Sequence, residues 1–233
     1  MKRWHSLNDF HKINPVELSR KTAIHEAGHA AAIYIGNKQK QLPPVYFQIF
    51  IKEQNYDSQT IGCLCKSYDG CNHCITRIEG GRLIHTLPSS LDEAVCDFSS
   101  AQKKAYQNAF EADIINLLVG PLAEANYVAM RDDEPINPRL VNLNALHSYG
   151  GSSDLETIKE YLDCLIADSA HREKKLSELF LAAFDFINDK SNWYAIMALA
   201  DYILMDRKKI IECEEIIAVL EAHYFVTRKS AWC

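Results

Sequence analysis

Two histidines, four residues apart, stand in the segment "TAIHEAGHAAAIY", which runs from Thr22 to Tyr34. Residues at this spacing share one face of an α-helix, so the imidazoles of His25 and His29 point the same way. Both can reach one Zn²⁺ at about 2.0–2.1 Å, and Glu26 can act on a water molecule at a remaining position. This is the H-E-x-x-H pattern of zinc peptidases, in which the histidines bind the metal and Glu26 is the general base.

The competing interpretation is a chance match, with two histidines on a partly buried helix face. Small residues around the histidines favour the metal, because they let other elements approach it closely; they are Ala27, Gly28, Ala30 and Ala31. Gly28 costs about 1 kcal/mol relative to alanine in a helix interior, so it needs a packing or functional reason. We therefore expect a metal site on this helix.

A catalytic zinc needs a third protein ligand. The pattern H-E-x-x-H-x-x-G-x-x-H is excluded, because Ala32 and Ile35 stand where its glycine and third histidine would be. Asp154 would lie in the first turn of a helix, whose dipole favours an ionised carboxylate, and Gly150-Gly151 would let the backbone come close. Local arguments leave four candidates open: Glu111, Glu124, His147 and Asp154.

The elements that must position these residues are mostly helical. Asn14-Pro15 is typical of a helix start, and the helical pattern then runs from Val16 to about Ile35 and stops at Gly36-Asn37. The β-branched and aromatic residues from Pro43 to Lys52 predict a strand, and Gln59 to Ser67 predicts its hairpin partner. Residues 66–90 predict a long loop, with at most a short strand at "RLIHTL".

From Leu91 the sequence predicts helices to the end. Pro121 is expected to kink or restart a helix after Gly120, and Ser153 with Glu156 resembles a capping box. Three further amphipathic helices are expected at "KKLSELFLAAFDFI", "NWYAIMALADYIL" and "CEEIIAVLEAHYF". We predict a mainly α (α+β) fold with a small hairpin or sheet near the N-terminus. One domain is expected over residues 1–233, with tails at 1–14 and 225–233.

Composition narrows the classes of function. Net charge is −6 and the 25 lysines and arginines are scattered, so we expect no nucleic-acid partner. The apolar stretch "WYAIMALADYILM" is interrupted by Asp201 and falls short of the about 20 residues of a membrane span. The N-terminus has no secretory pattern, so we expect a cytoplasmic protein without disulfides.

Four of the eight cysteines cluster in "CLCKSYDGCNHC", at Cys63, Cys65, Cys71 and Cys74. They suggest a structural zinc that ties down the loop, or alternatively free thiols without metal. The one-residue gap between Cys63 and Cys65 is unusual for zinc, so this cluster is left out of the expected site.

Several motifs resemble, in order, the protease domain of the FtsH family of AAA zinc metalloproteases. "TAIHEAGHA" is similar to its zinc helix, "NLLVGPLAEANY" to its L-L-G-G-R-x-A-E-E segment, and "GGSSDLETIKEYL" to the segment with its third zinc ligand. The resemblance runs from about Val16 to Leu220. It implies that His25, His29 and Asp154 bind Zn²⁺ in a largely helical peptidase, and that polypeptides are the substrates.

The departures from that family are also clear. The sequence has no G-x-x-x-x-G-K-[ST] motif, no room for an AAA domain and no membrane segment, while Pro121 and Ala125 replace an arginine and a glutamate of the family. We therefore expect a zinc metallopeptidase that is ATP-independent within this chain. A separate ATPase and a homo-oligomer are further candidate partners. The alternative function is a non-catalytic, zinc-stabilised adaptor derived from such a peptidase.

Overall fold

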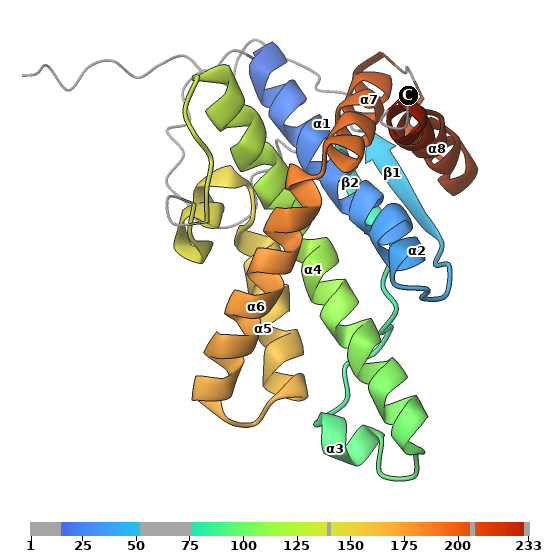
Figure 1. The fold of residues 1–233 in the computed structure, drawn as a ribbon, viewed down its shortest axis with the longest axis vertical. Coiled ribbons are helices and arrows are strands. Elements are labelled where there is room, and N and C mark those ends of the chain that lie inside the picture. The colour runs from blue at the N-terminus through green and yellow to red at the C-terminus, as the bar shows by residue number, and fades with distance from the viewer. Residues whose placement is uncertain (1–14, 52–75, 139–140, 206–207, 231–233) are drawn as a thin grey trace, which may run out of the picture.

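The structure is a computed structural model that describes residues 15–51, 76–138, 141–205 and 208–230. It is mainly helical, with one small three-stranded antiparallel sheet, which confirms the predicted mainly α (α+β) class (Figure 1). The predicted N-terminal tail at 1–14 lies outside the described residues.

The helix that carries the histidines is α1 (Pro15–Ala31), which begins at the predicted proline. Its predicted end at Gly36-Asn37 is wrong. One π-helical turn (Ala32–Gly36) continues α1 directly into the short α2 (Asn37–Gln39). Gly36 keeps right-handed helical dihedrals, with φ −63°, because its surroundings are buried and nothing forces the chain to turn there. The chain turns instead at Gln41, whose φ is 56°.

The sheet has the strand order β2-β1-β3. The predicted first strand is confirmed as β1 (Phe47–Ile51). Its partner is β2 (Thr76–Gly80), and the antiparallel pairing runs from Phe47 opposite Gly80 to Ile51 opposite Thr76. The predicted loop over 66–90 is therefore wrong at β2, and "RLIHTL" forms no strand. The predicted partner at Gln59 to Ser67 lies outside the described residues. Far along the chain, β3 (Ile210–Ile211) pairs with the other side of β1.

The longest helix is α4 (Ser100–Arg131), which follows the short α3 (Leu91–Ala94). Ser99 caps α4 in a reciprocal capping box with Gln102. The predicted restart after Gly120 is wrong, because α4 continues through Pro121. Proline removes one helical hydrogen bond, but the flanking turns are buried in the core around Val119 and Leu122, which holds the helix together.

A 3₁₀-helix, η2 (Leu143–Tyr149), leads into α5 (Ser152–Leu165), which has Asp154 in its first turn as predicted. The predicted capping box is wrong, because Gly151 is the N-cap and no side chain caps the helix. The three predicted C-terminal helices are confirmed as α6 (Ser169–Asn188), α7 (Lys190–Met205) and α8 (Cys213–Ser230). The last helix, α8, extends to Ser230 and so includes part of the segment expected as a tail from residue 225.

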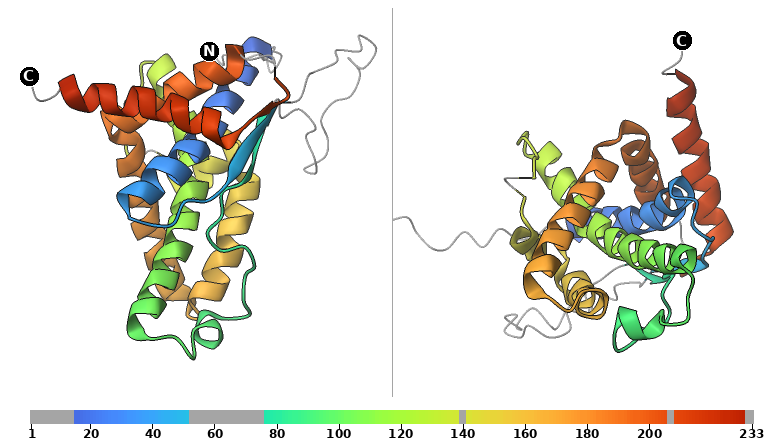
Figure 2. Two further views of the ribbon diagram at one scale, coloured as in Figure 1. Left: turned by 90° about the vertical axis from the view of Figure 1, so that its right-hand side faces the viewer. Right: turned by 60° about the horizontal axis from the view of Figure 1, so that its bottom comes forward.

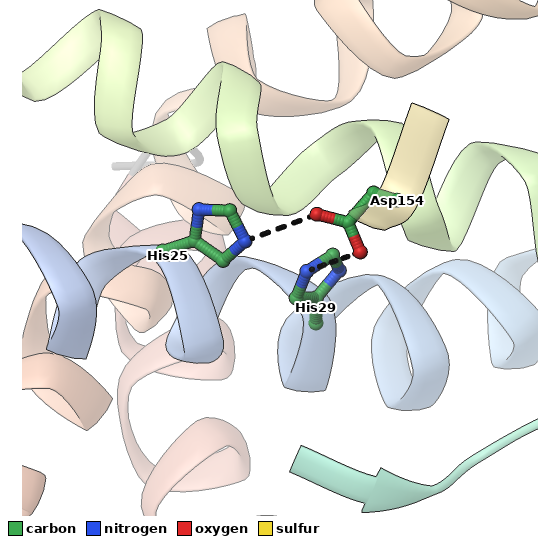
Figure 3. Close-up of side chains that lie close together, drawn as sticks. All are labelled: His25, His29 and Asp154. Atoms are coloured by element: carbon green, nitrogen blue, oxygen red, sulfur yellow. Dashed lines mark ion pairs between the residues drawn. The ribbon is translucent and has the colours of Figure 1, made fainter. Parts of the chain in front are cut away.

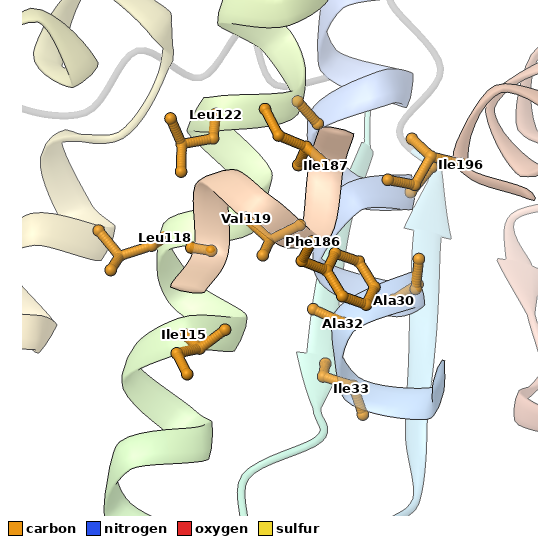
Figure 4. Close-up of a cluster of buried hydrophobic side chains, with 14 of the residues drawn as sticks. Ala30, Ala32, Ile33, Ile115, Leu118, Val119, Leu122, Phe186, Ile187 and Ile196 are labelled. Atoms are coloured by element: carbon orange, nitrogen blue, oxygen red, sulfur yellow. The ribbon is translucent and has the colours of Figure 1, made fainter. Parts of the chain in front are cut away.

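The hydrophobic core surrounds α1. This helix packs against α4 on one side and α7 on another, while α8 packs on α7 and contacts β1 (Figures 1 and 2). Alanines of α1, together with Ile33, meet Ile115, Val119 and Phe186 in the cluster of Figure 4. Contacts with α4, α7 and β2 therefore fix the position of the helix that carries the histidines.

Candidate metal centre

His25, His29 and Asp154 meet at the crossing of α1 and the start of α5 (Figure 3). The Nε2 atom of His25 lies 3.3 Å from Asp154 Oδ2, and Nε2 of His29 lies 3.6 Å from Asp154 Oδ1. Ligand atoms around a tetrahedral zinc are separated by about 3.3–3.6 Å, given metal–ligand distances of about 2.0–2.2 Å. One ligand atom from each residue lies within 4.8 Å of the others, so this group could hold a metal ion.

The second nitrogen of each imidazole faces a hydrogen-bond acceptor. His29 Nδ1 lies 2.8 Å from the carbonyl oxygen of Asn116, and His25 Nδ1 lies 3.2 Å from that of Tyr149 and 3.4 Å from Glu124 Oε2. These acceptors favour the tautomers that carry the proton on Nδ1. Both Nε2 lone pairs are then left for a metal. Histidines that bind metals commonly donate their other ring N–H to a carbonyl or carboxylate in this way.

Among the four candidate third ligands, Asp154 is the one that the structure brings to both Nε2 atoms. Glu124 contacts the opposite nitrogen of His25, where it can orient the ring. Glu111 pairs with Gln107 and Lys175. His147 is exposed and lies near the hydroxyl of Ser152.

The electrostatics of the cluster suit a cation. Buried Asp154 Oδ2 finds no hydrogen-bond partner among the residues that the structure describes. Burial alone would raise the pKa of Asp154, but His29 and His25 outweigh it and hold that pKa well below its usual range. Burial would lower the pKa of His25, but Asp154 and Glu124 raise it well above its ordinary value. Two imidazoles and a carboxylate with an orphaned oxygen are a donor set that zinc accepts, so the residues fit the metal.

Glu26 lies beside the ligands and is itself buried, with 9% exposure. Its Oε2 accepts a hydrogen bond of 2.7 Å from the backbone N–H of Ile78 in β2. Burial raises the pKa of Glu26, while His25, His29 and the Ile78 N–H oppose the increase. A carboxylate with a raised pKa is better matched to proton transfer near neutral pH.

Close backbone packing makes the cluster possible. A Cβ atom on Gly28 would lie 2.9 Å from Ala123 Cβ and 3.0 Å from the Val119 oxygen, which supplies the expected packing reason for this glycine. A Cβ on Gly120 would lie 2.3 Å from His29 Nε2. Gly150 adopts φ 72°, a conformation that glycine adopts readily, and a Cβ on it would lie 3.2 Å from His25 Nδ1.

A cavity of about 420 Å³ opens beside the cluster, and His29 and Asp154 form part of its wall. Its remaining wall comes from α4, from Ile33 and Tyr46, from residues 78–82 and from His85. The sequence analysis did not identify three groups of this site: the Asn116 carbonyl, the Ile78 N–H and the carboxylate of Asp113. Backbone groups carry no sequence signal, and Asp113 is one acid among many on a long helix.

The cluster of Cys63, Cys65, Cys71 and Cys74 lies outside the described residues, so its metal binding remains a prediction.

Comparisons with protein-family models, curated proteins and solved structures give no match for this chain. The resemblance to the FtsH protease domain therefore rests on its motifs and stays a prediction. Among the helices that the structure describes, none is long and apolar enough to cross a membrane.

Proposed function

We propose that this chain is a zinc-dependent metallopeptidase that cleaves polypeptides. One observation carries the proposal: both Nε2 atoms of an H-E-x-x-H helix converge on one carboxylate of a distant helix, with Glu26 beside them. His25, His29 and Asp154 would hold the Zn²⁺. The motif resemblance to the FtsH protease domain supports the same assignment.

Zinc at this position would supply a water molecule with a pKa near about 7 and would polarise the substrate carbonyl. Among the residues of the chain, Glu26 would transfer the proton. Its carboxylate is held by the Ile78 N–H, next to both histidines, where it can accept a proton from water. The same group can then donate that proton to the leaving amine.

The edge of β2 supports an extended polypeptide as the substrate. Among the described strands, β2 lies at one side of the sheet, and the Ile78 N–H points towards Glu26 rather than towards β1. Because backbone groups alternate in direction along a strand, those of Thr76 and Gly80 face the same side as the Ile78 N–H, away from β1. A peptide that adds to this edge would pass beside the cluster.

One observation favours the alternative, a non-catalytic metal-stabilised adaptor. The hydrogen bond from Ile78 gives Glu26 a structural role, because it fastens β2 to α1. An adaptor needs the metal ligands and this fastening, but it does not need a general base. The two functions therefore differ in what Glu26 does.

The experiment compares zinc-loaded wild type with Glu26→Gln on casein and on unstructured peptides, with and without a chelator. We expect the wild type to cleave and the chelator to stop it. We expect Glu26→Gln to retain zinc and to lose about 10²–10⁴-fold in rate, because the amide cannot accept the proton.

Two results would contradict the peptidase. One is cleavage by Glu26→Gln at the wild-type rate, which would mean that Glu26 is not the base. The other is a zinc-loaded wild type that cleaves none of these substrates, which would favour the adaptor.

A further inference from the structure

Asp113 is a buried carboxylate that the proposed chemistry does not use. It lies on α4 with 2% exposure. Its Oδ1 accepts from the N–H of Leu83 at 2.9 Å, and its Oδ2 accepts from the N–H of Ile84 at 2.9 Å. The hydroxyl of Tyr161 on α5 donates to Oδ2 at 3.1 Å. Both oxygens are thus occupied, and the carboxylate is not available to bind a ligand of its own.

These contacts join three parts of the site. Asp113 is one turn before Asn116, whose carbonyl faces His29, and Tyr161 is two turns after Asp154 on α5. Leu83 and Ile84 follow β2, whose Ile78 N–H holds Glu26. The backbone after the edge strand is therefore fixed to the helices that support the candidate metal ligands.

The residues on either side of the fixed Leu83–Ile84 backbone, Arg82 and His85, line the cavity. The cavity of about 420 Å³ is lined by His29 and Asp154, and also by Asp113, Arg82 and His85. Its apolar sides come from Ile33, Ile78 and Leu117. In a peptidase, a side chain next to the cleaved bond would enter a cavity that adjoins the metal ligands. The positions of Arg82 and His85 in the wall then limit how large that side chain can be.

We propose that Asp113 is a positioning residue for substrate selection: it holds the Leu83–Ile84 backbone, and so places Arg82 and His85 in the wall of a side-chain pocket beside the metal centre. It thereby sets which side-chain sizes are accepted. This inference rests on the proposed peptidase function. Leu83 and Ile84 lie outside the sheet, and their amides bond to Asp113. The Tyr161 hydroxyl, which donates to Asp113, also lies 3.2 Å from the Ile84 carbonyl oxygen and belongs to the same clamp.

The test measures binding, so that it does not depend on turnover. Zinc-loaded Glu26→Gln protein is titrated with fluorescent unstructured peptides that differ at one position by alanine, leucine or phenylalanine. We expect clear discrimination between them, since pocket size commonly gives about 10–200-fold. Adding Asp113→Asn places an amide NH₂ against one of the backbone N–H groups, so one of the two hydrogen bonds is lost and the pocket wall is held less firmly. We therefore expect the ratio of best to worst affinity to shrink about tenfold.

Tyr161→Phe provides a second variant, because it removes the hydroxyl that contacts Asp113 and the Ile84 carbonyl and keeps the ring that packs on Phe110. It should shift selectivity in the same direction. Glu111→Gln is the matched control on α4, because Glu111 contacts Gln107 and Lys175 instead of the wall. It should leave the ratio unchanged.

The possible results distinguish the role of Asp113 from the proposed peptidase function. Equal weakening for all three peptides, or an unchanged ratio in both Asp113→Asn and Tyr161→Phe, would overturn the role of Asp113 and leave the peptidase intact. Absence of peptide binding by zinc-loaded protein before any change at Asp113 would instead overturn the proposed function, and with it this inference.

Discussion

At the residue scale, the central feature is the meeting of Asp154 with both Nε2 atoms of the histidine pair. Sequence reasoning could place His25, Glu26 and His29 on one helix, because their spacing is local. It could not choose among Glu111, Glu124, His147 and Asp154 without the FtsH resemblance, because the approach of α5 to α1 depends on the packing of the whole core.

Asp154→Ala tests this choice directly. The change removes the carboxylate that faces both histidines, so zinc affinity should fall by more than the about 10–100-fold that loss of a supporting contact costs. The measurement is a competition titration with a chromophoric chelator.

The other three candidates serve as comparisons for Asp154→Ala. Glu111→Ala and His147→Ala should keep the wild-type affinity, because neither side chain contacts the cluster. Glu124→Ala should lie between the extremes, since Glu124 only orients His25. If His147→Ala or Glu111→Ala lost the metal while Asp154→Ala kept it, the assignment of the third ligand would be wrong.

At the element scale, the helices could largely be predicted and the sheet could not. Helices such as α6 and α7 show their period within the segment itself. By contrast, β2 has five residues in a stretch rich in glycine and cysteine, and β3 has two. Those strands exist because β1 offers them partners, and pairing between distant segments leaves little local signal.

Gly120→Ala tests the close approach of α4 to α1. A Cβ would lie 2.3 Å from His29 Nε2, so the ring must leave its place and zinc affinity should fall at least about tenfold. Helix propensity favours alanine over glycine by about 1 kcal/mol, so lost affinity would reflect the clash rather than a weaker helix. Isothermal titration with zinc measures the effect.

Gly36→Ala is the control for Gly120→Ala. Its Cβ would meet Phe186 at 3.6 Å, an ordinary contact, and its backbone is right-handed helical. We expect unchanged zinc affinity. Equal affinity in Gly120→Ala and wild type would show that His29 Nε2 does not need its present position to bind the metal.

At the scale of the whole molecule, the site is assembled by long-range packing. The candidate ligands come from α1 and α5, the carbonyls that orient the two histidines come from α4 and η2, and the N–H that holds Glu26 comes from β2. The core places these parts together, with α1 held between α4 and α7. A metal that joins α1 to α5 should therefore stabilise the folded chain as a whole, because it binds the native state and not the unfolded one.

The most direct test of the account is the metal content of the purified wild-type protein, measured by elemental analysis before and after a chelator, with thermal unfolding recorded in parallel. We predict about one zinc per chain at this cluster, removed by the chelator with a lower unfolding temperature and restored by added zinc. A second zinc per chain that persists in Asp154→Ala would belong to the cysteine cluster. Protein that contains no transition metal, and takes up none when zinc is added, would contradict the account.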